Sequence, residues 1–337
     1  MAYPPQPAAA PAKKPENYLL QLGILLVLLA ALLFTLIHFR VAACDFIHPA
    51  GCDIYYSLVA GGKPGVLIVH GDAGIGDPEY MYDVLRSPRF GARVSIRGLE
   101  EVSLPVLMES QLVIVERARV MGTDELRMFT DYVSRGGKLV WVGDAGTAAP
   151  AGESGSDYFL RYGEREAGGS QEFIGPWARK DGSKQFSFDH LLGVEYKANY
   201  CELVQCGPPQ GLVGHFKIND TGKRLVLGIS QALPYYGDFA VVGQNDDAYQ
   251  EVQAYLDYGE SLIGTPPANY IWLGNERTNF GRELPLIVSS GLGGRVAYYA
   301  FAPESVVGPG MPVDGATMQP VAYWGVLENM YYGMLYK

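Results

Sequence analysis

The sequence is poor in positive charge. Lys and Arg number 26 against 36 Asp and Glu, and the formal net charge is −10. A protein that binds DNA or RNA gains much of its affinity by neutralising phosphates with cations. The deficit of cations therefore excludes nucleic acid as an expected partner. Disorder over most of the chain is excluded too, because 48% of the residues are hydrophobic and 12% are aromatic, enough to form a core.

Charge is missing altogether from residues 19–37, LLQLGILLVLLAALLFTLI. As a helix, this run would be about 30 Å long, which is the thickness of the hydrocarbon core of a bilayer. Only Gln21 and Thr35 interrupt the apolar residues, so the polar stripe of a soluble helix is absent. The sequence predicts a transmembrane signal anchor over residues 18–39, and the membrane is the first expected partner.

The few charges around this segment predict its orientation. Lys13 and Lys14 precede it, whereas Arg40 alone follows it closely. The positive-inside rule then places the N-terminus in the cytoplasm and the body outside it, as a single-pass protein of the cell membrane. Residues 1–17 are rich in Pro and Ala, and we expect them to form a disordered cytoplasmic tail.

Cleavage after the apolar run is the alternative. Residues 41–44, Val-Ala-Ala-Cys, resemble a lipoprotein cleavage box with lipidation at Cys44. The apolar run is longer than the core of a typical signal peptide, and His38, Phe39 and Arg40 separate it from the box. These features favour the uncleaved anchor.

Cysteine is scarce, and all of it follows the anchor. The four cysteines form two close pairs in the sequence, Cys44 with Cys52 and Cys201 with Cys206. An even number of cysteines in an oxidising compartment favours disulfides, and residues that turn the chain lie within each pair, so we expect local pairing. Four buried thiols are the alternative. The first bridge would lie in a juxtamembrane segment, residues 40–64.

Asn219-Asp220-Thr221 forms a sequon for N-glycosylation at Asn219. It falls in a Gly-containing turn, and it is consistent with an exported domain.

Short apolar runs alternate with amphipathic stretches from residue 65 onward, which predicts an α/β domain with a parallel sheet over residues 65–337. We expect strands over 65–71, 92–98, 112–117 and 138–146, helices over 78–87, 123–136 and 249–262, and hairpins over 215–230 and 283–303. Residues 147–200 are expected to form an irregular insertion. The last residues, 321–337, predict an apolar helix that is buried or lies at a subunit contact.

The order of these elements resembles the class I glutamine amidotransferase-like fold. The resemblance rests on the segments YVSRGGKLVWVGDAG (132–146) and PLIVSSGLGGRV (285–296), and it covers residues 65–146 and, more loosely, 211–337. More narrowly, the pattern is similar to the non-amidotransferase branches: ThuA-like proteins, domains beside β-galactosidase barrels, and exported membrane-anchored relatives. The resemblance implies a flavodoxin-like parallel sheet with C-terminal β-hairpins.

The resemblance also implies where catalytic residues should lie. In that family, a nucleophilic cysteine follows the strand that matches 138–143, and a His and a Glu lie near the final strands. Here the turn carries Asp144, and no histidine follows His215. A carboxylate is a much weaker nucleophile toward an amide than a thiolate. Amidotransferase activity is therefore not expected, and the resemblance implies a pseudoenzyme.

Polar side chains nevertheless follow the predicted strands, at the edge where ligands bind to open parallel sheets. Asp144, Glu116 and His70 are candidate catalytic residues, and Asp72, Glu116 and Asp144 are candidate ligands of a divalent cation. The simpler interpretation is that Asp72 and Asp144 cap turns or helix starts, and that Glu116 pairs with Arg117 or Arg119. No other cofactor is expected.

We expect a non-catalytic recognition or assembly module at the cell surface, with a protein partner or a second copy of the chain as its ligand. One alternative is a hydrolase of envelope carbohydrate or peptide that uses the carboxylates at the strand edge. Another is an accessory subunit of an envelope transport complex. Converging carboxylates in a cavity would favour the hydrolase, whereas an exposed surface rich in Tyr and Met would favour assembly.

The charge asymmetry around residues 19–37 makes the topology testable. With a tag at each end of the chain, protease added to intact cells should remove the C-terminal tag and leave the N-terminal tag intact. Immunoblotting measures both, and permeabilised cells, in which both tags should be lost, are the control. A C-terminal tag that survives in intact cells would show that the orientation is wrong.

Overall fold

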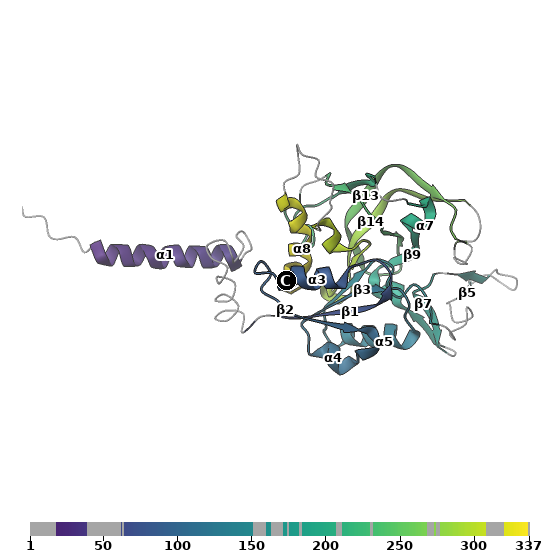
Figure 1. The fold of residues 1–337 in the computed structure, drawn as a ribbon, viewed down its shortest axis with the longest axis horizontal. Helices are drawn as coiled ribbons and strands as arrows, with labels where there is room; N and C mark the ends of the chain where they lie inside the picture. The colour runs from purple at the N-terminus through teal and green to yellow at the C-terminus, as the bar shows by residue number, and fades with distance from the viewer. Residues whose placement is uncertain are drawn as a thin grey trace, which may run out of the picture.

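A nine-stranded mixed sheet forms the centre of the body (Figure 1). Its strand order is β11-β10-β13-β14-β15-β4-β3-β1-β2. A computed structural model describes residues 18–38, 62, 64–150, 160–162, 171–173, 175–181, 184–206, 211–229, 232–267, 273, 277–307 and 320–335.

One half of the sheet is parallel, as the alternation of apolar runs predicts. Its strands are β2 (Arg93–Gly98), β1 (Gly65–Ala73), β3 (Leu112–Ala118), β4 (Leu139–Val142) and β15 (Val296–Tyr299). The central strands are buried on both faces, which is why they are almost continuously apolar. The strands expected over 65–71, 92–98 and 112–117 are confirmed, and the one expected over 138–146 is shorter.

The other half of the sheet is antiparallel and begins where β15 pairs with β14 (Thr278–Ser290). This pair confirms the hairpin expected over 283–303. Beyond it lie β13 (Gln250–Gly264), β10 (Gly214–Lys217) and β11 (Pro234–Tyr235).

Helices cover both faces of the parallel half (Figure 1). On one face lie α3 (Pro78–Arg86) and α8 (Pro320–Leu335), and on the other α4 (Leu104–Met108) and α5 (Thr123–Ser134). The start of α3 is fixed by its N-cap, because the Asp77 side chain accepts a hydrogen bond from the Tyr80 backbone N–H. Short 3₁₀ helices span Leu99–Glu101 (η1), Leu292–Gly294 (η3) and Pro303–Val306 (η4).

Helix α8 packs against the sheet rather than standing apart from it. Phe90, which follows α3, contacts the rings of Trp324, Tyr331 and Tyr332 of α8 at centroid distances of 5.5 to 6.3 Å. The apolar character of this helix is thus explained by burial. Several tyrosines are core residues as well, since Tyr235, Tyr298, Tyr299 and Tyr331 are all buried.

Two expected elements are wrong. The helix expected over 249–262 is strand β13, in which β-bulges between Val252 and Ala254 and between Asp257 and Leu262 break the alternation that identifies a strand. The hairpin expected over 215–230 is also wrong: β10 pairs with β11 and β13, and residues 219–228 form turns.

Residues 147–200 are more structured than the expected irregular insertion. Their described part contains β5 (Leu160–Tyr162) with β6 (Gln171–Phe173), β7 (Ala178–Asp181) with β8 (Lys184–Ser187), α6 (Phe188–Leu192) and β9 (Val194–Asn199), which pairs with β12 (Ala240–Gln244). Helix α7 (Tyr200–Val204) follows. Trp177, Phe188 and Leu192 join the core, so this segment is an integral layer of the domain.

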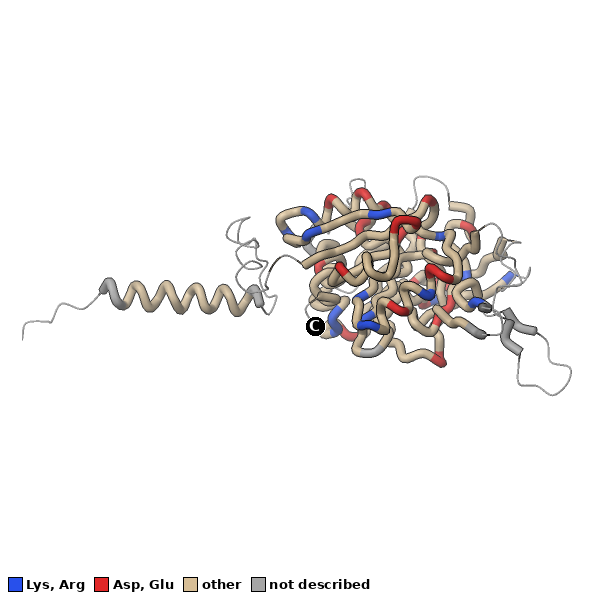
Figure 2. Tube along the Cα trace, turned by 90° about the horizontal axis from the view of Figure 1, so that it is seen from below, with Lys and Arg blue, Asp and Glu red and all other residues tan. Residues whose placement is uncertain are grey.

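The apolar segment near the N-terminus forms helix α1 (Tyr18–His38). Figure 2 shows no charged residue along it, whereas charges are spread over the body. Over the side chains that the structure describes, residues 21–36 of this helix included, no helix is long and apolar enough to cross a membrane. The membrane anchor and its orientation stay predictions. The tail 1–17, the 40–64 segment apart from Gly62 and Pro64, and the Cys44–Cys52 pair lie outside the described residues.

Two neighbouring tyrosines of β15 provide a matched test of the packing. Both are fully buried, but the Tyr298 hydroxyl donates a 3.0 Å hydrogen bond to the Gly143 carbonyl, whereas the Tyr299 hydroxyl has no partner among the described groups. Tyr298→Phe should lower the free energy of unfolding by about 1 kcal/mol, and Tyr299→Phe should leave it unchanged or raise it. Chemical denaturation of the two variants measures this difference. Equal losses would contradict the described bonding.

Candidate functional site

The carboxyl ends of β1, β3, β4 and β15 meet at one edge of the sheet. Strand β1 lies between β2 and β3, so successive strands are added on opposite sides of it, and ligands of open α/β sheets bind where the strand order reverses in this way. Glu116 lies near the end of β3 and Asp144 lies in the turn after β4, as the sequence predicts. Both are completely buried.

The turn after β4 is held by bonds to all of its carbonyl groups. Tyr298 binds the Gly143 carbonyl, and the indole N–H groups of Trp141 and Trp177 both donate to the Ala145 carbonyl, at 3.0 and 2.8 Å. Buried Arg179 donates to the Gly146 carbonyl at 3.0 Å, and Thr147 donates to that of Asp144 at 2.7 Å. The turn is therefore rigid and is part of the core.

Asp144 uses both of its oxygens within the protein. Oδ1 accepts a hydrogen bond from the Ile75 backbone N–H, and Oδ2 accepts one from the Asn199 side-chain amide, both at 2.8 Å. The Arg119 guanidinium lies 3.6 Å from Oδ2. In a nucleophile elbow, the nucleophile itself takes the strained conformation. Here Gly143 takes it, with φ at +58°, and Asp144 does not.

The loop after β1 covers this edge. Its backbone continues the pairing with β3, because Arg117 N–H donates to the Ile75 carbonyl and Arg119 N–H donates to that of Ala73. A Cβ atom at Gly74 would lie 2.8 Å from Asp144 Oδ1, and one at Gly76 would lie 2.8 Å from Glu116 Oε2. Only glycine allows the loop to approach both carboxylates this closely.

Glu116 lies beside a second buried carboxyl group, that of Glu304 in η4. The exposed fractions are 0% and 1%. Burial raises the pKa of Glu116 well above its ordinary value, and the charges of Glu304 and Asp77 raise it further. Burial likewise raises the pKa of Glu304 to about 7. Glu116 does not form the ion pair with Arg117 or Arg119 that the simpler interpretation expects.

The end of β9 is bonded to Asp144. Asn199, which donates to Asp144, also accepts a 3.0 Å hydrogen bond from the Tyr196 hydroxyl. Arg119 adds a second link, because it lies beside Asp144 and pairs with Glu202 of α7 at 2.8 Å. Asp144 thus joins β4, the loop after β1 and α7, which is a structural role.

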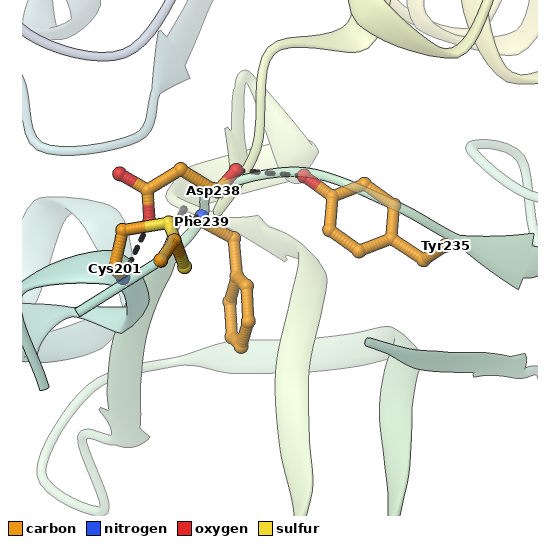
Figure 3. Close-up of a disulfide and its surroundings, with 5 residues drawn as sticks. Cys201, Tyr235, Asp238 and Phe239 are labelled. Carbon is orange, nitrogen blue, oxygen red and sulfur yellow. Dashed lines mark hydrogen bonds between the residues drawn. A yellow bond between two sulfur atoms is a disulfide. The ribbon is translucent and has the colours of Figure 1, made fainter. Parts of the chain in front are cut away.

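A disulfide closes α7 and confirms one of the two predicted bridges. Cys201 is bonded to Cys206, with their Cα atoms 4.7 Å apart. Figure 3 shows Asp238 beside it: its side chain accepts hydrogen bonds from the backbone N–H groups of Cys201 and Phe239, and its carbonyl accepts one from the Tyr235 hydroxyl. Burial raises the pKa of Asp238 to about 6, although the two N–H bonds lower it.

His70 and Asp72 do not join the buried carboxylates. Asp72 is exposed, and His70 is half-buried, with Nδ1 3.1 Å from the Gly71 carbonyl oxygen. Among the described residues, no hydrogen bond or ion pair links either of them to Glu116 or Asp144, and no group of three or more His, Cys, Asp or Glu could hold a metal ion. The cation site proposed from Asp72, Glu116 and Asp144 gains no geometric support there.

A pocket of about 660 Å³ lies at the opposite edge. Gly65 and Arg93, at the amino ends of β1 and β2, line it together with Tyr82, Arg86 and Glu109. It is therefore remote from Asp144.

No family model and no curated protein matches the chain. Among solved structures, a protein from Bacteroides uniformis described as ThuA-like matches with 16% identity and a TM-score of 0.45, over 79% of this chain and 91% of its own. A protein from Thermoplasma acidophilum described as one component of GMP synthase matches with 10% identity and a TM-score of 0.41, over 81% and 94%. A β-galactosidase from Rahnella sp. R3 matches with 12% identity and a TM-score of 0.43, over 80% and 31%. At TM-scores below 0.5, these likenesses decide nothing about the activity of this chain.

The structural role of Asp144 predicts the effect of a single replacement. In Asp144→Asn, the new amide would face the donating amide of Asn199, so the free energy of unfolding should fall by about 1 to 3 kcal/mol. Chemical denaturation measures the loss. The double variant Asp144→Asn/Asn199→Asp, which restores a donor opposite an acceptor, should recover part of it. An Asp144→Asn variant as stable as the wild type would contradict this role.

Proposed function

We propose that the chain is a membrane-anchored, extracytoplasmic recognition or assembly module, built on a glutamine amidotransferase-like fold without a catalytic nucleophile. The order β2-β1-β3-β4-β15 of the parallel strands supports the fold, because it corresponds to the 2-1-3-4-5 order of flavodoxin-like sheets. The uncharged segment 19–37 supports the anchor.

The observation that carries the non-catalytic role is the burial of Asp144. A nucleophile or general base must reach the reacting atom of its substrate. Asp144 has no exposed surface, both of its oxygens are bonded within the protein, and the loop after β1 lies over it. A group in this position stabilises a scaffold, and a rigid scaffold that presents loops is what a recognition module requires.

A carboxylate hydrolase is the second candidate, because the Glu116–Glu304 pair favours it. Two adjacent carboxyl groups with raised pKa values occur in enzymes that use one as acid and the other as base. Their complete burial leaves a substrate no path to either group, so we place this candidate second.

The test uses the full chain in detergent and in cells. We expect no Asp144-dependent hydrolysis of glycan, ester or amide substrates, and we expect surface cross-linking to yield the same adduct, heavier than the monomer, in the wild type and in Asp144→Asn. The exposed replacement Asp131→Asn is the matched control. Circular dichroism verifies that the variants are folded at the assay temperature.

Two results would overturn the proposal. One is turnover that Asp144→Asn abolishes and Asp131→Asn does not. The other is the absence of any cross-linked adduct in the wild type at its native level in the membrane.

A further inference from the structure

Two glutamates from distant parts of the sequence meet under the loop after β1. Glu116 lies near the end of β3, and Glu304 lies in η4, which follows β15. We propose that these two side chains form a buried proton-binding site that latches residues 74–77 over the carboxyl edge of the sheet and releases them when the shared proton is lost. This inference goes beyond the proposed function and does not depend on what the domain binds.

The geometry connects the pair directly to the loop. Oε1 of Glu304 accepts a 2.7 Å hydrogen bond from the Asp77 backbone N–H, at the start of α3. Oε2 of Glu116 lies against Gly76, where even a methyl group would come within 2.8 Å. The next residue of the same loop, toward the N-terminus, is Ile75, which donates to Asp144. The carboxyl pair therefore holds the loop down together with Asp144 and the backbone bond between Arg117 and Ile75.

Three of the four oxygens of the pair lack a hydrogen-bond donor unless the pair holds a proton. Both oxygens of Glu116 and Oε2 of Glu304 are buried and have no donor among the described groups. Two ionised carboxylates only accept hydrogen bonds, so they can bond to each other only when one is protonated. A single shared proton would join one oxygen of Glu116 to Oε2 of Glu304 and would leave one negative charge instead of two.

The surrounding charges do not compensate a second negative charge. Asp77 of the loop, Tyr80 of α3 and Tyr235 of β11 lie near the pair; none of them is a cation, and Asp77 adds repulsion. On β1, His70 lies beside Glu116 in register but directs Nδ1 to the Gly71 carbonyl. On β3, Arg117 is exposed, and Arg119 pairs with Asp144 and Glu202 instead.

The direction of the pH dependence follows from these contacts. Burial raises the pKa of both groups above the ordinary value of 4.5, to about 7 for Glu304. The folded state therefore retains a proton that the unfolded state releases. The stabilisation is complete below about pH 4.5 and is lost as the pH rises through the folded pKa values. The loop should be closed at acidic and neutral pH and should open under alkaline conditions.

The experiment measures how often the loop opens, through the exchange of its backbone amide hydrogens with solvent. Amide hydrogen exchange of residues 74–77 is followed in the full chain in detergent from about pH 5 to about pH 9, and it is corrected for the intrinsic dependence of exchange on pH. In the wild type, the corrected exchange should rise roughly tenfold or more across this range. In Glu116→Gln, which has the shape of the protonated acid and supplies a donor, it should stay flat.

A matched control and an independent readout complete the test. Glu79→Gln removes an exposed carboxylate from the first turn of α3 and should behave like the wild type. Infrared spectra near neutral pH should contain the carbonyl band of a protonated carboxyl group, and the band should be lost in Glu116→Gln or in Glu304→Gln.

Wild-type exchange that does not change with pH, or the absence of the infrared band from the wild type, would overturn the proposal. Both measurements use the wild type, so they decide the matter even if a glutamine variant does not fold. Neither measurement involves a partner, so their failure would leave the recognition role untouched.

Discussion

The bonds of Asp144 are the constraint on which the arrangement of the carboxyl edge depends. One side chain, buried in the turn after β4, holds the loop after β1 through Ile75 and the end of β9 through Asn199. Each partner is itself fixed: Ile75 by its backbone bond to Arg117, and Asn199 by the Tyr196 hydroxyl. Because a buried carboxylate without donors is costly, these three segments stabilise one another.

Most of the parallel half of the sheet could be predicted from the sequence, because β1, β3 and β4 are short apolar runs with turns between them. Burial on both faces makes such strands conspicuous, and the helices between them have regular apolar spacing. The predicted strands also placed Glu116 and Asp144 correctly, because the carboxyl ends of parallel strands meet at one edge of the sheet. They could not reveal that both side chains point inward, because burial depends on the loop with Gly74 and Gly76 that covers them.

The rest of the fold and of the candidate site could not be predicted, because it depends on contacts between residues far apart in the sequence, which local sequence patterns do not reveal. β15 has the sequence of the second arm of a hairpin, which it is, but it also pairs in parallel with β4. That second pairing brings Glu304 to the edge, so the residue was missed although it follows a predicted strand. Asn199 and Arg179 were missed for a similar reason, because their segment shows no periodicity and gains its structure from packing on the turn after β4.

The double pairing of β15 also has a consequence for how the chain folds. Strand β15 joins the parallel half of the sheet to the antiparallel half, and it lies more than 150 residues after β4 in the sequence. Strand β4 therefore lacks a neighbour on one side until residue 296 is available. Contacts this far apart in sequence slow folding and leave a strand edge exposed in the meantime. A chain that emerges in order, from its N-terminus, would therefore hold an incomplete sheet until β15 has been made. Its need for protection from aggregation would be greatest just before the last strand arrives.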